Sequence, residues 1–86
     1  MNINYESLPE GLQGGMKRYV EQGIKPGSFM TAVLENDLFG ALAQADEMNR
    51  DRLYDICKWL YNEAPSQCWG SKEKVEAWIA KGGAGK

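Results

Sequence analysis

The chain has 86 residues, of which 43% are hydrophobic and 26% are charged, and its formal net charge is −2. A chain of this length builds one hydrophobic core rather than two, so we expect a single domain over residues 1–86. Ten Lys and Arg against twelve Asp and Glu leave no basic excess of the kind that nucleic-acid-binding proteins carry. Three Trp, four Tyr and two Phe supply large apolar groups, which excludes an intrinsically disordered chain.

The apolar stretches of the chain are too short for a membrane protein. The longest, residues 29–45, is interrupted by polar and charged side chains, whereas a membrane span needs about 20 apolar residues. Residues 1–10 carry no positive charge and no apolar run, so no signal peptide is expected. We therefore expect a cytoplasmic protein without membrane contact, in which Cys57 and Cys68 form no disulfide.

The first predicted helix begins at Pro9 and ends at Gly23, with Pro in its first turn and Gly at its C-terminus. An apolar stripe recurs along it at helical spacing. The members of this stripe are Leu12, Met16, Tyr19 and Val20. Three glycines at positions 11, 14 and 15 share one flank of the helix with Arg18, and each costs about 0.8–1 kcal/mol relative to Ala. This flank has two interpretations. In the first, another helix passes close to it or the first turn is irregular. In the second, it is a backbone surface open to a partner.

The second predicted helix follows a break at residues 25–27, with Ser28 as its N-cap. Helical spacing continues over residues 29–45 and predicts one continuous helix, with Gly40 tolerated inside it. A second interpretation divides this segment at Asp37, which would then cap a separate short helix.

The third predicted helix begins at Asn49 and ends near Ala64, before a proline. With Asn49 as N-cap, Met48 and Leu53 have the spacing of a hydrophobic staple. The face predicted to be buried consists of Leu53, Ile56, Cys57, Leu60 and Ala64. Cys57 is therefore expected to be a buried small hydrophobic residue rather than a reactive thiol.

The last predicted helix begins after the N-cap Ser71 and ends at Gly82-Gly83, with Val75, Trp78 and Ile79 on one side. Loose ends are expected at about residues 1–7 and 82–86. No stretch alternates with period two for long enough to form a strand. The sequence therefore predicts an all-α fold, a compact bundle of three to four short helices.

The residue types that carry most enzyme chemistry are missing. The chain has no His, which removes Ser–His and Cys–His nucleophiles and the commonest general base. Two Cys without His do not complete a zinc site, and no phosphate-binding loop or dinucleotide fingerprint is present. We therefore expect no catalytic residue, no metal and no cofactor, and the sequence favours a protein that is not an enzyme.

A candidate partner-binding surface lies on the third predicted helix. Trp59 is expected to point roughly 120° away from the apolar stripe. There it is either packed against the last helix or an exposed anchor for a partner, since Trp, Tyr and Arg are enriched in binding hot spots. The residues expected to surround it are Tyr54, Lys58, Asn62 and Glu63. Arg18 of the first helix is a further candidate.

A series of short motifs extends from about residue 8 to residue 83. In the N-terminal half these are Gly14-Gly15, Arg18-Tyr19-Val20-Glu21, Gly23-Ile24, Pro26-Gly27-Ser28-Phe29, Ala32-Val33-Leu34 and Asn36-Asp37-Leu38. In the C-terminal half they are Tyr61-Asn62-Glu63-Ala64-Pro65, Cys68-Trp69-Gly70-Ser71 and Trp78. The series resembles small proteins of unassigned function encoded by phages and prophages. This resemblance implies a compact helical domain in a phage context and carries no catalytic residue.

Together these features favour a phage or prophage accessory protein that binds and modulates a bacterial host protein, such as a defence or regulatory component. One alternative is a small DNA-binding or transcription-modulating helical protein. Its phosphate contacts would come from Lys17, Arg18, Lys72 and Lys74. The other alternative is a minor structural component that forms homo-oligomers.

Overall fold

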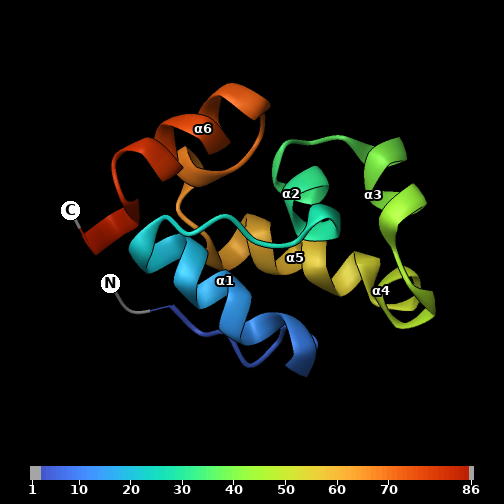
Figure 1. Ribbon diagram of the computed structural model, residues 1–86. Coiled ribbons are helices and arrows are strands. Elements are labelled where there is room, and N and C mark those ends of the chain that lie inside the picture. Colours follow the sequence, from blue (N-terminus) through green and yellow to red (C-terminus); the bar gives the residue numbers. More distant parts are fainter. Residues whose placement is uncertain (1–2, 86) are drawn as a thin grey trace.

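The regular secondary structure of the described residues is entirely helical. The structure, a computed structural model, describes residues 3–85, and this range contains no strand. Its elements are α1 (Glu10–Gln22), α2 (Ser28–Leu34), α3 (Leu38–Gln44), α4 (Glu47–Asp51), α5 (Leu53–Glu63), the 3-10 turn η1 (Ser66–Cys68), α6 (Lys72–Ala80) and the 3-10 turn η2 (Gly83–Gly85). The predicted all-α class is confirmed, although the described residues form six short helices where three to four were expected (Figure 1).

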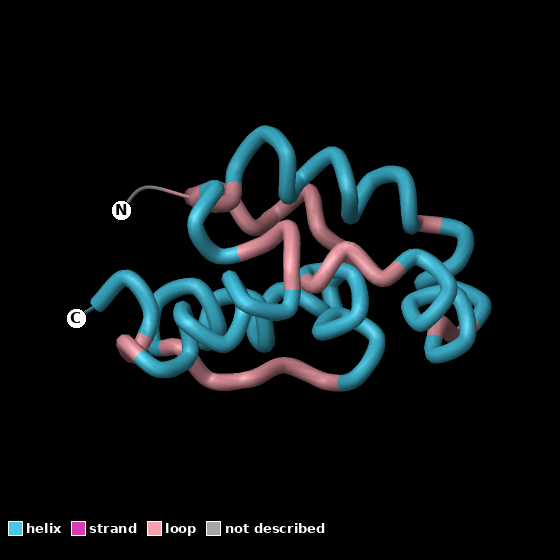
Figure 2. Tube along the Cα trace, turned by 90° about the horizontal axis from the view of Figure 1, so that it is seen from above, coloured by secondary structure: helices cyan, strands magenta, loops and turns pink. Residues whose placement is uncertain are grey.

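The helices surround one core, to which α5 contributes centrally. In the view of Figure 1, α5 crosses the middle of the molecule, with α1 below it and α2 and α6 above. Both termini lie at one end of the molecule, and α3 and α4 lie at the other end (Figures 1 and 2). The largest fully buried side chains are Leu8, Met16, Tyr19, Val20, Leu34, Ile56, Trp59, Cys68 and Val75. Among residues 3–85, each helix is too short or too polar to cross a lipid bilayer.

The first helix begins and ends where its sequence predicts. Pro9 occupies the N-cap position of α1, and Gly23 ends the helix in the left-handed conformation with φ of 72°. The Gly23 amide donates to the Tyr19 carbonyl at 2.9 Å, and the Ile24 amide donates to the Arg18 carbonyl at 3.3 Å. These bonds satisfy carbonyl groups that the end of a helix otherwise leaves without partners.

The flank of α1 that carries three glycines has no helix against it, contrary to one of the two expectations. A Cβ at Gly11 would meet no atom within 4 Å, and a Cβ at Gly14 would meet the Arg18 guanidinium at 3.3 Å. The Arg18 side chain itself therefore lies along this flank. The first turn is regular helix, so irregular geometry does not explain the glycines either.

The continuous helix predicted over residues 29–45 is wrong, and the division at Asp37 is correct. Asn36 adopts φ of 63° between α2 and α3, a conformation that Asn accepts more readily than most residues. The Asp37 carboxylate accepts the Gly40 amide at 2.9 Å and caps α3. Gly40 has a specific role here, because a Cβ at this position would collide with the capping carboxylate.

The N-cap predicted at Asn49 is also wrong, because an earlier acidic residue takes that role. Asp46 accepts the Asn49 amide at 2.8 Å and caps α4, which ends at Arg52 before α5 begins. Met48 remains 63% exposed, so it does not form the predicted hydrophobic staple. The predicted end of this segment is confirmed, since α5 stops before Pro65.

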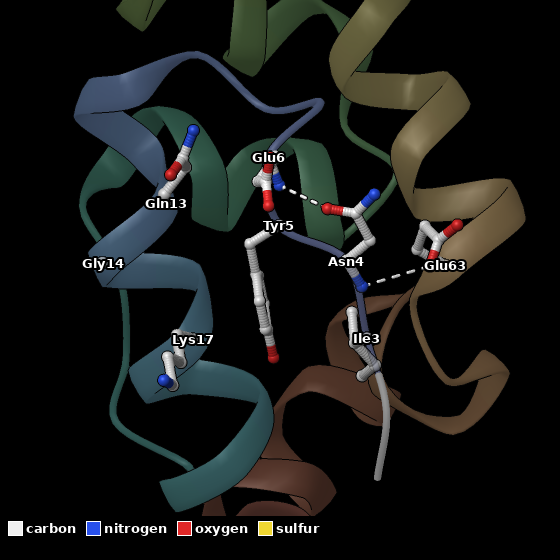
Figure 3. A pocket seen from close by; sticks show the side chains of 8 residues that line it. All are labelled: Ile3, Asn4, Tyr5, Glu6, Gln13, Gly14, Lys17 and Glu63. Carbon is white, nitrogen blue, oxygen red and sulfur yellow. Dashed lines mark hydrogen bonds between the residues drawn. The ribbon is translucent and has the colours of Figure 1, made fainter.

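The ends of the chain are packed rather than loose over the part that the structure describes. Leu8 is 2% exposed, and residues 3–8 run between α1 and α5 (Figure 3). At the other end, η2 contacts α1 and Gly83 is buried. The Trp78 indole N–H on α6 donates to two carbonyls in the last turns of α1, those of Tyr19 and Val20, at 3.1 and 3.2 Å. Residues 1, 2 and 86 lie outside the described residues.

The predicted start of α6 is confirmed. Ser71 adopts extended backbone angles, and its hydroxyl accepts the Lys74 amide at 3.2 Å. Val75 and Trp78 are buried as expected, and Ile79 is half-buried.

Candidate functional site

The core-facing side of α5 includes the predicted Ile56 and Leu60, but it leaves Cys57 exposed and extends to Trp59. Ile56, Trp59 and Leu60 are at most 2% exposed, whereas Cys57 is exposed. At about 100° per residue, the buried sector is rotated by roughly 60° from the predicted stripe, away from Cys57 and toward Trp59. The interpretation of Trp59 as an exposed anchor is therefore wrong, and so is the expectation that Cys57 is buried.

Trp59 is held in the core by contacts with the N-terminal segment. Its indole N–H donates to the Asn4 carbonyl oxygen at 2.6 Å. The ring of Tyr5 lies against the indole, with 5.5 Å between ring centroids and a tilt of 34°. Paired aromatic rings in this distance range stabilise each other beyond the area that they bury. Trp59 thus fixes residues 4 and 5 on α5.

Three of the predicted site residues surround the edge of Trp59. Lys58, Asn62 and Glu63 line one open hollow of about 300 Å³, together with residues of the N-terminal segment. The Glu63 carboxylate accepts the Asn4 amide at 3.3 Å, which ties this wall to the N-terminus. These three side chains lie near Trp59 as helical spacing predicts, but the buried Trp59 is not available as an anchor.

The other two predicted residues lie outside this hollow. Tyr54 is 75% exposed on α5 but does not line the hollow. Arg18 is exposed on α1 and lies beside Gly14. The structure therefore does not assemble the six predicted residues into one site.

A larger hollow of about 660 Å³ opens between α1 and the N-terminal segment (Figure 3). Its lining residues are Ile3, Asn4, Tyr5, Glu6, Gln13, Gly14, Lys17 and Glu63. The Tyr5 hydroxyl donates to the Glu21 carboxylate at 3.3 Å. Burial and the neighbouring Glu21 charge raise the pKa of Tyr5 well above its usual range, so the phenol keeps its proton. This wide polar hollow contains no activated nucleophile or base.

The thiols of the protein are likewise held in their protonated forms. Burial raises the pKa of Cys68 to about 12, and partial burial raises the pKa of Cys57. A reactive cysteine requires the opposite shift, because the thiolate is the nucleophile. Residues 3–85 also contain no group of three or more His, Cys, Asp or Glu side chains that could hold a metal ion.

The most unusual surface of the protein lies on α3, α4 and α5. Six large apolar or aromatic side chains are exposed there, and we call them the α3–α5 patch. They are Leu38, Phe39, Leu42, Met48, Tyr54 and Tyr61. Phe39 is 82% exposed and Tyr61 is 78% exposed, values far above those of a core position. Within the described part of the chain, Ile24 is the remaining exposed large hydrophobic residue outside the patch.

A small notch of about 70 Å³ lies between α3 and α5, beside Leu38 of this patch. Its walls are Val33, Asn36, Asp37, Leu38, Ala41, Leu53 and Cys57. Most of these side chains are apolar, and the notch has room for the end of one aliphatic side chain, since a water molecule occupies about 30 Å³ in the liquid. Cys57 is exposed because it faces this notch instead of the core.

Sequence reasoning missed the α3–α5 patch because it treated residues 38–45 as part of a longer helix. Once Asp37 begins a separate helix, the seven residues of α3 carry apolar side chains on several sides. Ala41 is the one residue of α3 that is buried. The helix break at Asn36-Asp37 was therefore the sequence signal that most side chains of this apolar segment do not face the core.

Comparisons with known proteins identify no relative of this chain. No family model matches it, no curated protein matches it, and no solved structure is similar to it.

Proposed function

We propose that the protein is a binding module that acts without catalysis, and that the α3–α5 patch is its docking surface for another protein. The observation that carries this proposal is the exposure of six large apolar side chains on α3, α4 and α5. Soluble monomers rarely expose apolar patches larger than a few hundred Å², and larger ones mark interaction sites. Aromatic residues and Met are also enriched in protein interfaces.

The chemistry of the remaining surface supports binding over catalysis. The groups whose pKa values are shifted are tyrosines and thiols, and each shift favours the protonated form. The Tyr5 phenol in the larger hollow donates to the Glu21 carboxylate, but its raised pKa keeps it protonated rather than activated. We include in the proposal a bacterial host protein as partner, in the phage or prophage context that the sequence resemblance implies.

The proposal is tested by affinity capture from bacterial lysate with purified, tagged protein. We expect a host protein in stoichiometric amount with the wild type and its loss with Phe39→Ser/Tyr54→Ser. Both replaced side chains are at least 75% exposed, so their removal should change the free energy of unfolding by no more than about 0.5 kcal/mol each. Ile24→Ser is the matched control, because Ile24 is an exposed aliphatic residue outside the patch.

Circular dichroism melts establish that each variant is folded before capture. Retention of the same host protein by the folded double variant would show that the docking surface lies elsewhere. Loss of capture with the Ile24→Ser control would show that the effect is not specific to the patch.

A further inference from the structure

The charge around the α3–α5 patch indicates the chemistry of its partner, an inference that rests on the proposed function. Between residues 35 and 55 the chain carries six carboxylates and two cations. The carboxylates are Glu35, Asp37, Asp46, Glu47, Asp51 and Asp55. One of the cations, Arg52, is paired with Asp55 at 2.7 Å, which leaves Arg50 as the other.

The remainder of the chain has the opposite balance, with six carboxylates and eight cations. The protein is therefore polarised, and α3 and α4 form its acidic end, away from both termini (Figure 1). Lys58 on α5 is the cation that borders this end between Tyr54 and Tyr61. Since opposite potentials across an interface favour the correct partner and speed association, this end favours a basic surface.

The spacing of the apolar side chains in the patch suits a helical partner. Leu38 and Leu42 lie one helical turn apart on α3, and Tyr54 and Tyr61 lie two turns apart on α5. The notch between α3 and α5 provides a recess for one aliphatic side chain. Amphipathic helices bind to such apolar surfaces through side chains that recur at i, i+3, i+4 and i+7.

We propose that the partner contributes a basic amphipathic helix, which inserts an aliphatic side chain into the notch and places Lys or Arg against the carboxylates of the acidic end. A second copy of this chain fits less well. A face-to-face dimer through the patch would place two acidic ends against each other, and such like-charge juxtaposition disfavours that dimer.

A synthetic peptide tests this proposal directly. The probe is a fluorescent 16-residue helix with Leu at the four anchor positions and Lys at the polar positions, and the control peptide carries Glu in place of Lys. We expect fluorescence anisotropy to show at least tenfold tighter binding of the Lys peptide than of the Glu peptide. The affinity for the Lys peptide should fall with rising salt, because surface charges are screened.

Variants distinguish the patch from non-specific attraction. Leu38→Ser should weaken binding of the Lys peptide at least fivefold, while Ile24→Ser should leave it unchanged. Glu47→Gln/Asp51→Asn should reduce the preference for Lys over Glu. Glu73→Gln/Glu76→Gln removes the same charge from exposed positions of α6, and this matched control should keep the preference.

Cys57 provides a second readout inside the notch. Cys57 is exposed, whereas Cys68 is fully buried, so N-ethylmaleimide should modify Cys57 first. The bound Lys peptide should slow this modification at least fivefold in the wild type. Modification at an unchanged rate under saturating peptide would place the peptide outside the notch and overturn the proposal.

The remaining outcomes are equally decisive. Equal binding of the Lys and Glu peptides, sensitive to Leu38→Ser, would overturn the basic partner and leave the proposed function intact. Binding of the Lys peptide that Leu38→Ser does not weaken would be non-specific and would overturn the proposal. Absence of binding would also overturn it. If light scattering shows that the wild type self-associates and that Leu38→Ser does not, the patch would be assigned to a second copy of this chain.

Discussion

Replacement of Trp59 tests the orientation of α5 most sharply, because the sequence allowed both a packed and an exposed Trp59 and the structure places it in the core. Trp59 is 2% exposed, and truncation of a buried Trp to Ala costs about 3–5 kcal/mol. A domain of this size has about 4–13 kcal/mol of total stability, so Trp59→Ala can leave little folded protein. We therefore expect a loss of at least 3 kcal/mol, which corresponds to a fall in Tm of more than about 12 °C.

A milder substitution separates the hydrogen bond from the packing. Trp59→Phe keeps an aromatic ring but removes the indole N–H that donates to the Asn4 carbonyl at 2.6 Å. Asn4 is exposed, so water can partly replace the donor, and we expect a loss of about 1–2 kcal/mol, at the lower part of the range for an unpaired buried group. The control is Tyr61→Ala, on the same helix at 78% exposure, with an expected change within about 0.5 kcal/mol.

Urea denaturation followed by far-ultraviolet circular dichroism measures these differences without relying on Trp emission. The expected order of destabilisation is Trp59→Ala, then Trp59→Phe, then Tyr61→Ala. A loss below 1 kcal/mol for Trp59→Ala, or an equal loss for Tyr61→Ala, would refute the assigned face of α5.

Four further predictions follow from buried or constrained positions. Leu60→Ala should cost about 2–5 kcal/mol in a denaturant melt, since Leu60 is 2% exposed; a loss below 1 kcal/mol would contradict its core position. Gly83→Ala should destabilise the protein, because Gly83 has φ of 75° and a Cβ would collide with the backbone of α1, whereas Gly11→Ala should raise thermal stability by up to about 1 kcal/mol. Ellman's reagent should react with Cys57 in the native protein and with Cys68 only after unfolding. Equal reaction rates of the two thiols in the native protein would contradict the burial of Cys68. Burial raises the pKa of Cys68 to about 12, so the folded state retains a proton that the unfolded state releases near pH 9. The free energy of unfolding should therefore fall as pH rises between these values. Melts at pH 9 to 11 should show a smaller fall with pH for Cys68→Ala than for the wild type, and an equal fall would contradict this linkage.

Signals that act within a few residues could be predicted from the sequence. Ser71 caps α6, Gly23 ends α1 and Pro65 follows the end of α5, because capping and chain-breaking depend on local backbone geometry. Competition between two local signals was harder to resolve. Asp46 and Asn49 are both good N-caps, and the structure uses Asp46.

Features that depend on distant segments could not be predicted in the same way. Cys57 and Trp59 are both apolar, and the choice between them as core residues depends on the N-terminal segment, whose Asn4 and Tyr5 cover Trp59. The sequence gives no local reason for that segment to pack. The neighbourhood of Lys58, Asn62 and Glu63 followed from helical spacing, but the α3–α5 patch became visible only once α3 was known to be a separate helix.

Photo-crosslinking from the α3–α5 patch tests the central claim most directly. A benzophenone amino acid is placed at position 39 in one variant and at position 24 in another, and each protein is irradiated in living bacterial cells. Both positions are exposed, so the comparison isolates location on the surface. We predict a discrete host-protein adduct from position 39 and none from position 24. The same adduct from position 24 with none from position 39 would contradict the assignment of the patch as the docking surface.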